Sequence, residues 1–243
     1  MIILGIDVGG TGIKGALVDV ETGILTSNRR RIPTPSPATP EAVAETIQKL
    51  KQHFKWEGTV GCGFPTPLKH GKCLTGGNLH EDWKDLKVDE FFQQKTGNKY
   101  TIVNDADAAG LAEVTFGAGK GVKGTVILIT LGTGIGSALF LDGKLLPNTE
   151  FGHVLHKNGA IFEKYAADSV RVEENLSRKQ WGKRLHKYFK HINLILSPDL
   201  IIIGGGSSKK FNKFEAQINI DTEIIPAKAE NDAGIIGAAL AAK

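Results

Sequence analysis

The chain has 243 residues, which is long for one compact domain and short for two large ones, so we expect two small lobes. Two cysteines give no disulfide framework, and no run of about 18 apolar residues predicts a membrane span. The formal net charge of +4 suits a polyanionic ligand but selects no function alone. The chain opens on a strand-like segment, so we expect no signal peptide and a cytoplasmic location.

Strands and helices alternate along the chain, which is typical of an α/β fold. Apolar, β-branched runs that end in glycine or proline predict strands at residues 2–7, 15–20, 59–64, 100–103, 126–130 and 200–203. Helices are predicted from about residue 41, after residue 105, across 161–196 with breaks, and over 231–241. The Pro-rich segment 33–40 is expected to be a loop, because proline is excluded from helix interiors and central strands.

One short pattern occurs twice. Gly10-Thr11-Gly12-Ile13 follows the first strand, and Gly132-Thr133-Gly134-Ile135 follows the strand at 126–130. Each copy leads through a second strand to another glycine turn, so the chain is expected to hold two lobes of like topology. Successive backbone N–H groups in glycine turns form concavities that bind anions, and two such loops can grip one phosphate chain.

A single copy of this pattern also fits a plain hairpin turn. A dinucleotide-binding fold is disfavoured, because the second strand begins too soon after the glycines to leave room for a helix. Neither copy has the spacing of a P-loop.

Several motifs, in this order, resemble the ROK family of sugar kinases. They are Asp7 to Thr11 with Lys14, Asn104-Asp105-Ala106, Leu131 to Gly136, and Glu150-Phe151-Gly152-His153. Longer stretches at 104–113, 147–153, 197–211 and 231–239 resemble the branch of that family that uses polyphosphate. The resemblance covers nearly the whole chain.

The resemblance implies an actin-like (ribonuclease H-like) fold with two lobes, each a βββαβα unit, around a cleft. We expect an N-terminal lobe at residues 1–107, with the helix at 231–243 packing back on it, and a C-terminal lobe at 108–230. The implied reaction is phosphoryl transfer from polyphosphate, ATP or both to the 6-hydroxyl of glucose, with Mg²⁺ as cofactor.

Asp105 follows a strand and precedes a helix, a place where α/β sheets present active-site residues. A sugar hydroxyl is a weak nucleophile that needs a carboxylate to accept its proton. The resemblance therefore implies that Asp105 is the general base and that Asn104 binds a sugar hydroxyl. An Asx turn or a helix N-cap is the alternative for this pair.

The resemblance implies four further sugar ligands, which are Asn78, Glu150, His153 and Glu163. A hexose needs several directed hydrogen bonds, which carboxylates and imidazoles supply. A surface loop is the alternative for Glu150 and His153, a solvated helix residue for Glu163, and a turn residue for Asn78.

The family pattern also implies phosphate contacts. These are Gly9, Gly10, Thr11, Gly12, Lys14, Gly132, Thr133, Gly134, Gly204, Gly205, Lys209 and Lys210. Asp7 would position Mg²⁺ through water, since that cation keeps most of its hydration shell. Lys209 and Lys210 would carry positive charge along a longer polyanion, or they are an exposed lysine pair on the surface.

The chain departs from the family pattern at three places. Residues 154–165 lack the cysteines of a structural zinc site, so none is expected. Thr66 and the segment 75–78 differ from the polyphosphate-using branch near the expected sugar site, so mannose or glucosamine is an alternative acceptor.

Two other functions occur as alternatives for a chain with these motifs. A DNA-binding repressor of this family would carry an added N-terminal module, which this chain does not show, so no nucleic acid is expected as a partner. A non-catalytic sugar-binding protein would have lost the base, whereas Asp105 is present. A homodimer is implied by the family.

Overall fold

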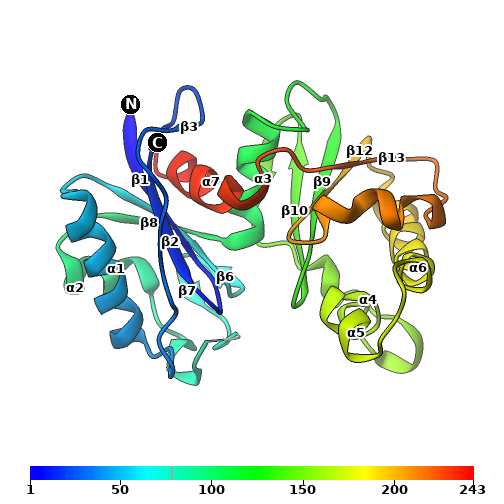
Figure 1. The fold of residues 1–243 in the computed structure, drawn as a ribbon, viewed down its shortest axis with the longest axis horizontal. Coiled ribbons are helices and arrows are strands. Elements are labelled where there is room, and N and C mark those ends of the chain that lie inside the picture. Colours follow the sequence, from blue (N-terminus) through cyan, green and yellow to red (C-terminus); the bar gives the residue numbers. More distant parts are fainter. Residues whose placement is uncertain (78) are drawn as a thin grey trace. The chain divides into compact units, whose positions relative to one another are not determined.

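The structure is a computed structural model that describes residues 1–77 and 79–243. Contacts divide the chain into two compact units, drawn in Figure 1. The first unit comprises Met1–Ala112 and Asp232–Lys243, and the second comprises Glu113–Asn231. Among the described helices, none combines the length and the hydropathy that crossing a membrane requires.

The first unit is built on a six-stranded sheet. Its strands are β1 (Ile2–Val8), β2 (Ile13–Asp19), β3 (Ile24–Leu25), β4 (Arg30–Ile32), β5 (Val60–Phe64) and β8 (Tyr100–Asn104). They lie in the order β3-β2-β1-β5-β8, with β4 also paired to β2. Strands β1, β5 and β8 are parallel, and a small hairpin of β6 (Leu68–Lys69) and β7 (Lys72–Cys73) stands apart.

Four helices belong wholly or mostly to this unit. They are α1 (Pro40–Phe54), α2 (Val88–Thr96), α3 (Asp105–Thr115) and α7 (Ala233–Ala241). Helix α1 starts where predicted, because the Thr39 hydroxyl accepts the Ala42 N–H and Pro40 fits the first turn. It ends at Lys55, which adopts the left-handed conformation that closes many helices.

Helix α7 lies directly against the sheet backbone of the first unit (Figure 1). It contacts β1 and β5, where Gly5 faces Ile235 and Gly61 faces Ala238. A Cβ at either glycine would overlap a carbonyl oxygen of α7, so the close approach needs both glycines. The helix ends the chain in sequence but completes the unit that begins it.

The second unit has a five-stranded sheet. Its strands are β9 (Thr125–Leu131), β10 (Ile135–Leu141), β11 (Lys144–Leu146), β12 (Leu200–Gly204) and β13 (Glu223–Pro226). They lie in the order β11-β10-β9-β12-β13, and β9, β12 and β13 are parallel. The predicted helical stretch at 161–196 forms three helices, α4 (Glu163–Ala166), α5 (Asp168–Glu173) and α6 (Arg178–Leu196).

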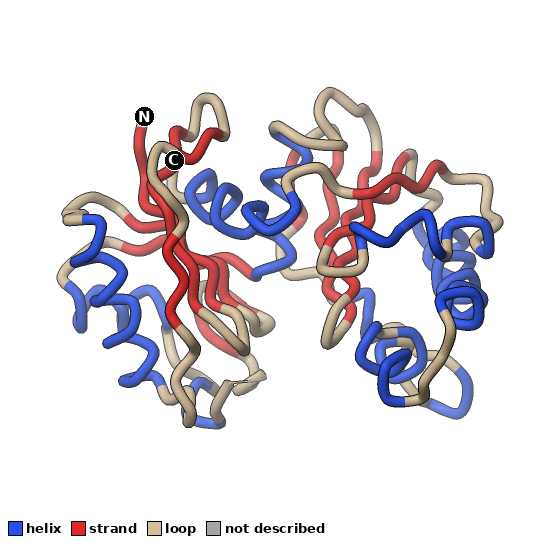
Figure 2. Tube along the Cα trace, in the orientation of Figure 1, coloured by secondary structure: helices blue, strands red, loops and turns tan. Residues whose placement is uncertain are grey.

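The two sheets repeat one topology (Figure 2). In each, an antiparallel hairpin of two long strands continues into a short third strand, and two parallel strands follow on the other side of the first. This repetition confirms the duplicated α/β architecture that the two glycine motifs predict.

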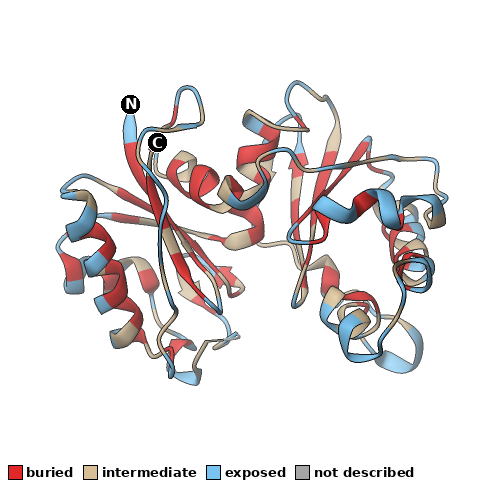
Figure 3. Ribbon diagram, in the orientation of Figure 1, coloured by how far each residue is buried: buried red, intermediate tan, exposed pale blue. Residues whose placement is uncertain are grey.

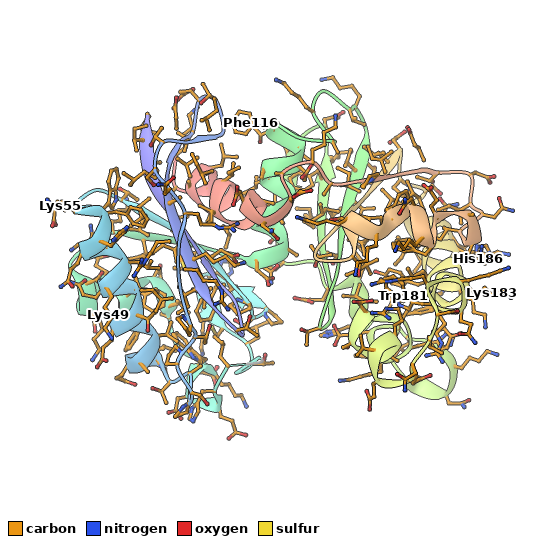
Figure 4. All side chains as sticks on the ribbon, in the orientation of Figure 1. Lys49, Lys55, Phe116, Trp181, Lys183 and His186 are labelled. Atoms are coloured by element: carbon orange, nitrogen blue, oxygen red, sulfur yellow. The ribbon has the colours of Figure 1, made fainter. Side chains whose placement is uncertain are left out.

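Each unit buries its own apolar core (Figure 3). In the second unit, Trp181, Leu185, Phe189 and Ile192 of α6 are fully buried. Trp181 also donates its indole N–H to the Ala166 carbonyl at 2.8 Å. Lys183, labelled with Trp181 in Figure 4, is exposed. These apolar positions of α6 therefore belong to the core of the second unit.

Candidate functional site

In the first unit, the two candidate catalytic carboxylates end neighbouring strands. Asp7 pairs with Gly63 across β1 and β5, and Gly63 pairs with Val103 across β5 and β8. Asp105 follows β8 directly as the first residue of α3. Parallel strands end at a common edge, which is where open α/β sheets bind ligands. Asp7 and Asp105 therefore share the edge that the fold offers for a site.

Asn104 has a structural task at this edge. Its side-chain oxygen accepts the N–H groups of Ala106 at 2.9 Å and Asp107 at 3.3 Å, and its amide donates to the Thr66 carbonyl at 3.3 Å. This is the helix-cap geometry weighed as the alternative to sugar binding. Asn104 is also buried, so it fixes the turn that presents Asp105.

Two side chains stabilise the first glycine loop, Gly9–Gly12, by donating hydrogen bonds to its carbonyls. The Gly9 N–H donates to the Gly12 carbonyl at 3.1 Å, which closes the turn, and Gly10 and Thr11 are exposed at its tip. The Thr34 hydroxyl donates to the Gly9 carbonyl, and the Arg31 guanidinium donates to the Thr11 carbonyl, both at 2.5 Å. With its carbonyls so occupied, the loop has its tip free to meet an anion.

Asp7 and Lys14 form a partly buried ion pair beside that loop. Lys14 Nζ lies 3.1 Å from Asp7 Oδ2, and the two residues are register partners on β1 and β2. The backbone of Gly234 closes over the carboxylate, leaving no room there for a Cβ. One aspartate suits Mg²⁺, which takes one or two carboxylates together with waters and substrate phosphates. The residues present therefore fit that cation.

In the described residues, no three His, Cys, Asp or Glu side chains gather as a group that could hold a metal ion. The two cysteines are buried thiols, and Cys73 accepts a hydrogen bond from the Thr66 hydroxyl at 3.2 Å. Burial raises the pKa of both.

In the second unit, the glycine loop Gly132–Gly134 is held by α4 and α5. The Gly132 N–H donates to the Gly134 carbonyl at 3.1 Å. Ser169 donates its N–H to the Gly132 carbonyl at 3.1 Å and its hydroxyl to the Thr133 carbonyl at 2.6 Å. Glu163 accepts the Ile135 N–H at 2.9 Å, so this predicted sugar ligand also anchors the loop.

Glu150 directly precedes a single 3-10 turn, Phe151–His153, that follows β11, and His153 is the last residue of this turn. The Ser137 hydroxyl on β10 fixes this turn by accepting the Phe151 N–H and donating to the Thr149 carbonyl. Burial raises the pKa of Glu150, Glu163 raises it further, and His153 opposes the shift. Glu150, His153 and Glu163 are thus within electrostatic reach of one another.

The third glycine run follows β12. Gly205 has a φ of +74° and packs against the backbone of Leu131, so this turn lies next to the end of β9. The Ser208 hydroxyl donates to the Gly205 carbonyl at 2.8 Å. Lys209 pairs with Glu230 at 2.7 Å, and Lys210 is exposed. Of this lysine pair, Lys209 therefore has its charge partly compensated.

The structure brings the predicted residues together in two groups, one in each unit. The predicted sugar ligand Asn78 lies outside the described residues. Sequence reasoning missed Arg31, Thr34 and Ser169, which hold the glycine loops. For Arg31, the run of three arginines at 29–31 is a local pattern that could have drawn attention to it. Thr34 and Ser169 stand in no comparable pattern.

Residues 3–164 match the model of the ROK family. With this match and the full-length likeness given next, the chain belongs to the ROK family. It is 44% identical to the polyphosphate glucokinase of Mycobacterium tuberculosis over 238 residues, which is 98% of this chain and 89% of that protein.

Solved structures agree with this membership. The inorganic polyphosphate/ATP-glucomannokinase of Arthrobacter sp. strain KM superposes with a TM-score of 0.93 at 43% identity, covering 98% of this chain and 97% of that one. A ROK glucokinase from Streptomyces griseus, solved with glucose and AMPPNP, has a TM-score of 0.85 at 22% identity and covers 98% of each chain. The latter likeness supports the fold alone.

Proposed function

We propose that this protein transfers a phosphoryl group from inorganic polyphosphate or ATP to the 6-hydroxyl of glucose, giving glucose 6-phosphate. The observation that carries the proposal is the 44% identity to a polyphosphate glucokinase along 98% of the chain, together with Asp105 directly after a strand end. The polyphosphate/ATP-glucomannokinase supports both donors.

Asp105 acts as the general base. Its place at the start of α3 is rigid, because the Asn104 cap fixes the turn before it and Ala106 donates its N–H to Asp105 Oδ1 at 2.8 Å. The Asp105 carboxylate accepts the proton of the sugar 6-hydroxyl as the hydroxyl oxygen bonds to the terminal phosphorus, and the bond from that phosphorus to the bridging oxygen of the donor breaks, so that the shortened donor leaves. A positioned base of this kind contributes about 10²–10⁴-fold to a rate.

The donor phosphates lie on the glycine loops, whose N–H groups and lysine stabilise charge without covalent chemistry. Lys14 holds Asp7 in place and supplies positive charge beside the first loop. When bound, Mg²⁺ neutralises charge on the donor phosphates, and Asp7 is the residue that would hold it through water. Gly204, Gly205, Lys209 and Lys210 extend the phosphate-binding surface of the second unit.

In the second unit, Glu150, His153 and Glu163 bind the sugar. In the first unit, Asn78 stays a predicted sugar ligand, and the Asn104 amide is engaged in the helix cap. Carboxylates accept hydrogen bonds from neighbouring hydroxyls, so Glu150 orients the ring. Glu163 gives one oxygen to the Ile135 N–H and has its other oxygen for a hydroxyl. The Glu163 side chain thereby links the bound sugar to the glycine loop Gly132–Gly134, which holds the donor.

The test is a purified-protein assay of glucose 6-phosphate formation with each donor, on the wild type and on Asp105→Asn. We expect kcat to fall by about 10²–10⁴-fold in the variant, while calorimetry shows glucose binding with little change. Asp85→Asn is the matched control, because Asp85 is an exposed aspartate of the same unit paired with Lys72 at 2.8 Å. If the wild type made no glucose 6-phosphate from either donor, the proposal would fail.

Mannose is the second acceptor that we propose. The glucomannokinase, at 43% identity, supports it. A comparison of kcat/KM for glucose, mannose and glucosamine ranks the three acceptors.

We also propose that the chain forms a homodimer and acts in the cytoplasm, as the family resemblance implies. Leu194 and Ile195 are 79% and 51% exposed at the end of α6, where they offer apolar surface to a partner. Sedimentation of the purified protein measures the assembly directly.

A further inference from the structure

Two arginines of the second unit gather around one carboxylate. Arg171 Nε lies 2.5 Å from Asp168 Oδ1, and Arg178 Nη1 lies 3.1 Å from the same oxygen. Their side chains are only 19% and 17% exposed. Arg171 belongs to α5 and Arg178 begins α6, so the cluster ties together two consecutive helices separated by residues 174–177.

This cluster lies next to two of the glycine loops. Ser169, two residues from Arg171, donates to the carbonyls of Gly132 and Thr133. Arg178 Nη1 lies 3.4 Å from the buried hydroxyl of Ser207, which directly follows the third glycine run. Both loops follow parallel strands, since Thr130 of β9 is the register partner of Gly204 of β12. The arginines therefore lie beside the edge of the sheet where ligands bind.

The positive charge of the cluster is incompletely compensated. Two guanidinium groups share one carboxylate, which leaves a net positive charge. Burial lowers the pKa of Arg178, and the like charge of Arg171 lowers it further, against the opposing effect of Asp168. The whole second unit has the same imbalance, with 16 basic and 12 acidic residues, whereas the first unit has 14 of each. An anion at the cluster would relieve this imbalance.

We propose that Arg171 and Arg178 bind the part of a polyphosphate chain that extends beyond the phosphates held on the glycine loops. The inference rests on the proposed function and names a determinant of its donor preference. The planar guanidinium fork matches phosphate geometry and stays charged when partly buried. Polyphosphate continues as an anion past its terminal phosphates, whereas ATP continues as a ribose and a base that carry no negative charge. The cluster therefore favours the longer donor.

A purely structural role is the competing explanation. Arg178 packs over the Trp181 ring at 5.2 Å, and with Asp168 and Ser207 it holds the start of α6 against the third glycine run. Loss of a structural tie would weaken every donor alike and lower the thermal stability. Loss of a phosphate ligand weakens binding only for chains long enough to reach it. Donor length therefore separates the two roles.

The experiment measures KM and kcat for ATP and for polyphosphates of increasing length in wild type, Arg171→Gln and Arg178→Gln. Arg184→Gln is the matched control, because Arg184 is a third partly buried arginine, six residues further along α6, that pairs with the carboxylate of Glu174 at 2.5 Å. We expect each test variant to raise KM for long polyphosphate about tenfold, with kcat nearly unchanged and KM for ATP changed less than about twofold. Arg178→Lys should restore part of the loss, since it keeps the charge but not the fork.

The result that overturns the inference is an equal change of KM for ATP and for long polyphosphate, or an equal effect of Arg184→Gln. If Arg178→Gln does not fold, the same comparison of KM for ATP with KM for long polyphosphate is made on Arg171→Gln and Arg178→Lys, and its outcome tests the inference. Direct titration of the wild type and variants with long polyphosphate in the absence of glucose adds a readout that needs no turnover. A wild type that makes no glucose 6-phosphate sinks the proposed function, whereas an active wild type whose variants show no length-dependent loss sinks this inference alone.

Discussion

The structure raises the pKa of Glu150, which is a proposed sugar ligand. Burial is the main cause, and the neighbouring Glu163 adds to it. A raised pKa means that the folded state holds this proton more tightly than the unfolded chain does. Stability is therefore lost as pH rises from the ordinary glutamate pKa of 4.5 through the raised value, because the buried carboxyl must then ionise.

Glu150→Gln removes this cost, since an amide does not ionise. We expect its melting temperature to exceed that of the wild type at neutral pH, and the difference to vanish below pH 4.5, where both side chains are neutral. Thermal unfolding followed over a series of pH values measures this. Glu45→Gln, at an exposed position of α1, should show no such difference. A stabilising effect that persists at acid pH would contradict the assignment to ionisation.

The elements of the first unit depend on a backbone contact that only glycine permits. Gly61 of β5 faces the Ala238 carbonyl of α7, and an added Cβ would overlap that oxygen. Backbone atoms on both sides cannot give way cheaply, so Gly61→Ala should lower the free energy of unfolding by several kcal/mol, about 3 or more. Denaturant unfolding of the purified variant measures the loss.

Gly63→Ala is the control for this prediction. Gly63 lies two residues further along the same strand, so it faces the same side of the sheet. Its added Cβ would meet the Ala108 Cβ at 3.5 Å, which is ordinary contact. We expect a change of less than about 1 kcal/mol. Equal losses in the two variants would mean that α7 is not what restricts β5.

The strands and helices can be predicted from the sequence more completely than the tertiary contacts among them. Apolar runs and glycine turns predict the two hairpins, because strand burial and turn geometry are local properties. The matching strand orders follow from the repeat of the two glycine motifs. Ser169 meets Thr133 from 36 residues away, however, and Arg178 meets Ser207 from 29 residues away. No periodicity marks such pairs, so the arginine cluster emerges only in three dimensions.

Asn104 illustrates a second limit of the sequence. Its position before Asp105 fits both a sugar ligand and a helix cap, and the two uses compete for the same amide atoms. The structure shows the cap fully formed. The sequence indicates both uses of Asn104. It does not show which of the possible hydrogen bonds form in the folded protein.

At the scale of the whole molecule, the charge is unevenly distributed. The formal net charge of +4 resides entirely in residues 113–231, the unit that holds the second and third glycine loops. A unit with a net charge of one sign raises the local concentration of an oppositely charged ligand, and dissolved salt screens this attraction. Raising the ionic strength from about 0.01 M to about 0.1 M shortens the screening length from about 30 Å to about 10 Å.

We therefore expect KM for long polyphosphate to rise several-fold over that range of salt, KM for ATP to rise less, and KM for glucose to stay constant. Polyphosphate carries more negative charge than ATP, and glucose carries none, so glucose serves as the internal control. Steady-state kinetics at constant Mg²⁺ and pH provides the measurement. Equal salt dependence for polyphosphate and ATP would mean that only the shared terminal phosphates feel the charge of this unit. In that case the selection between donors would have to arise from shape rather than from electrostatics.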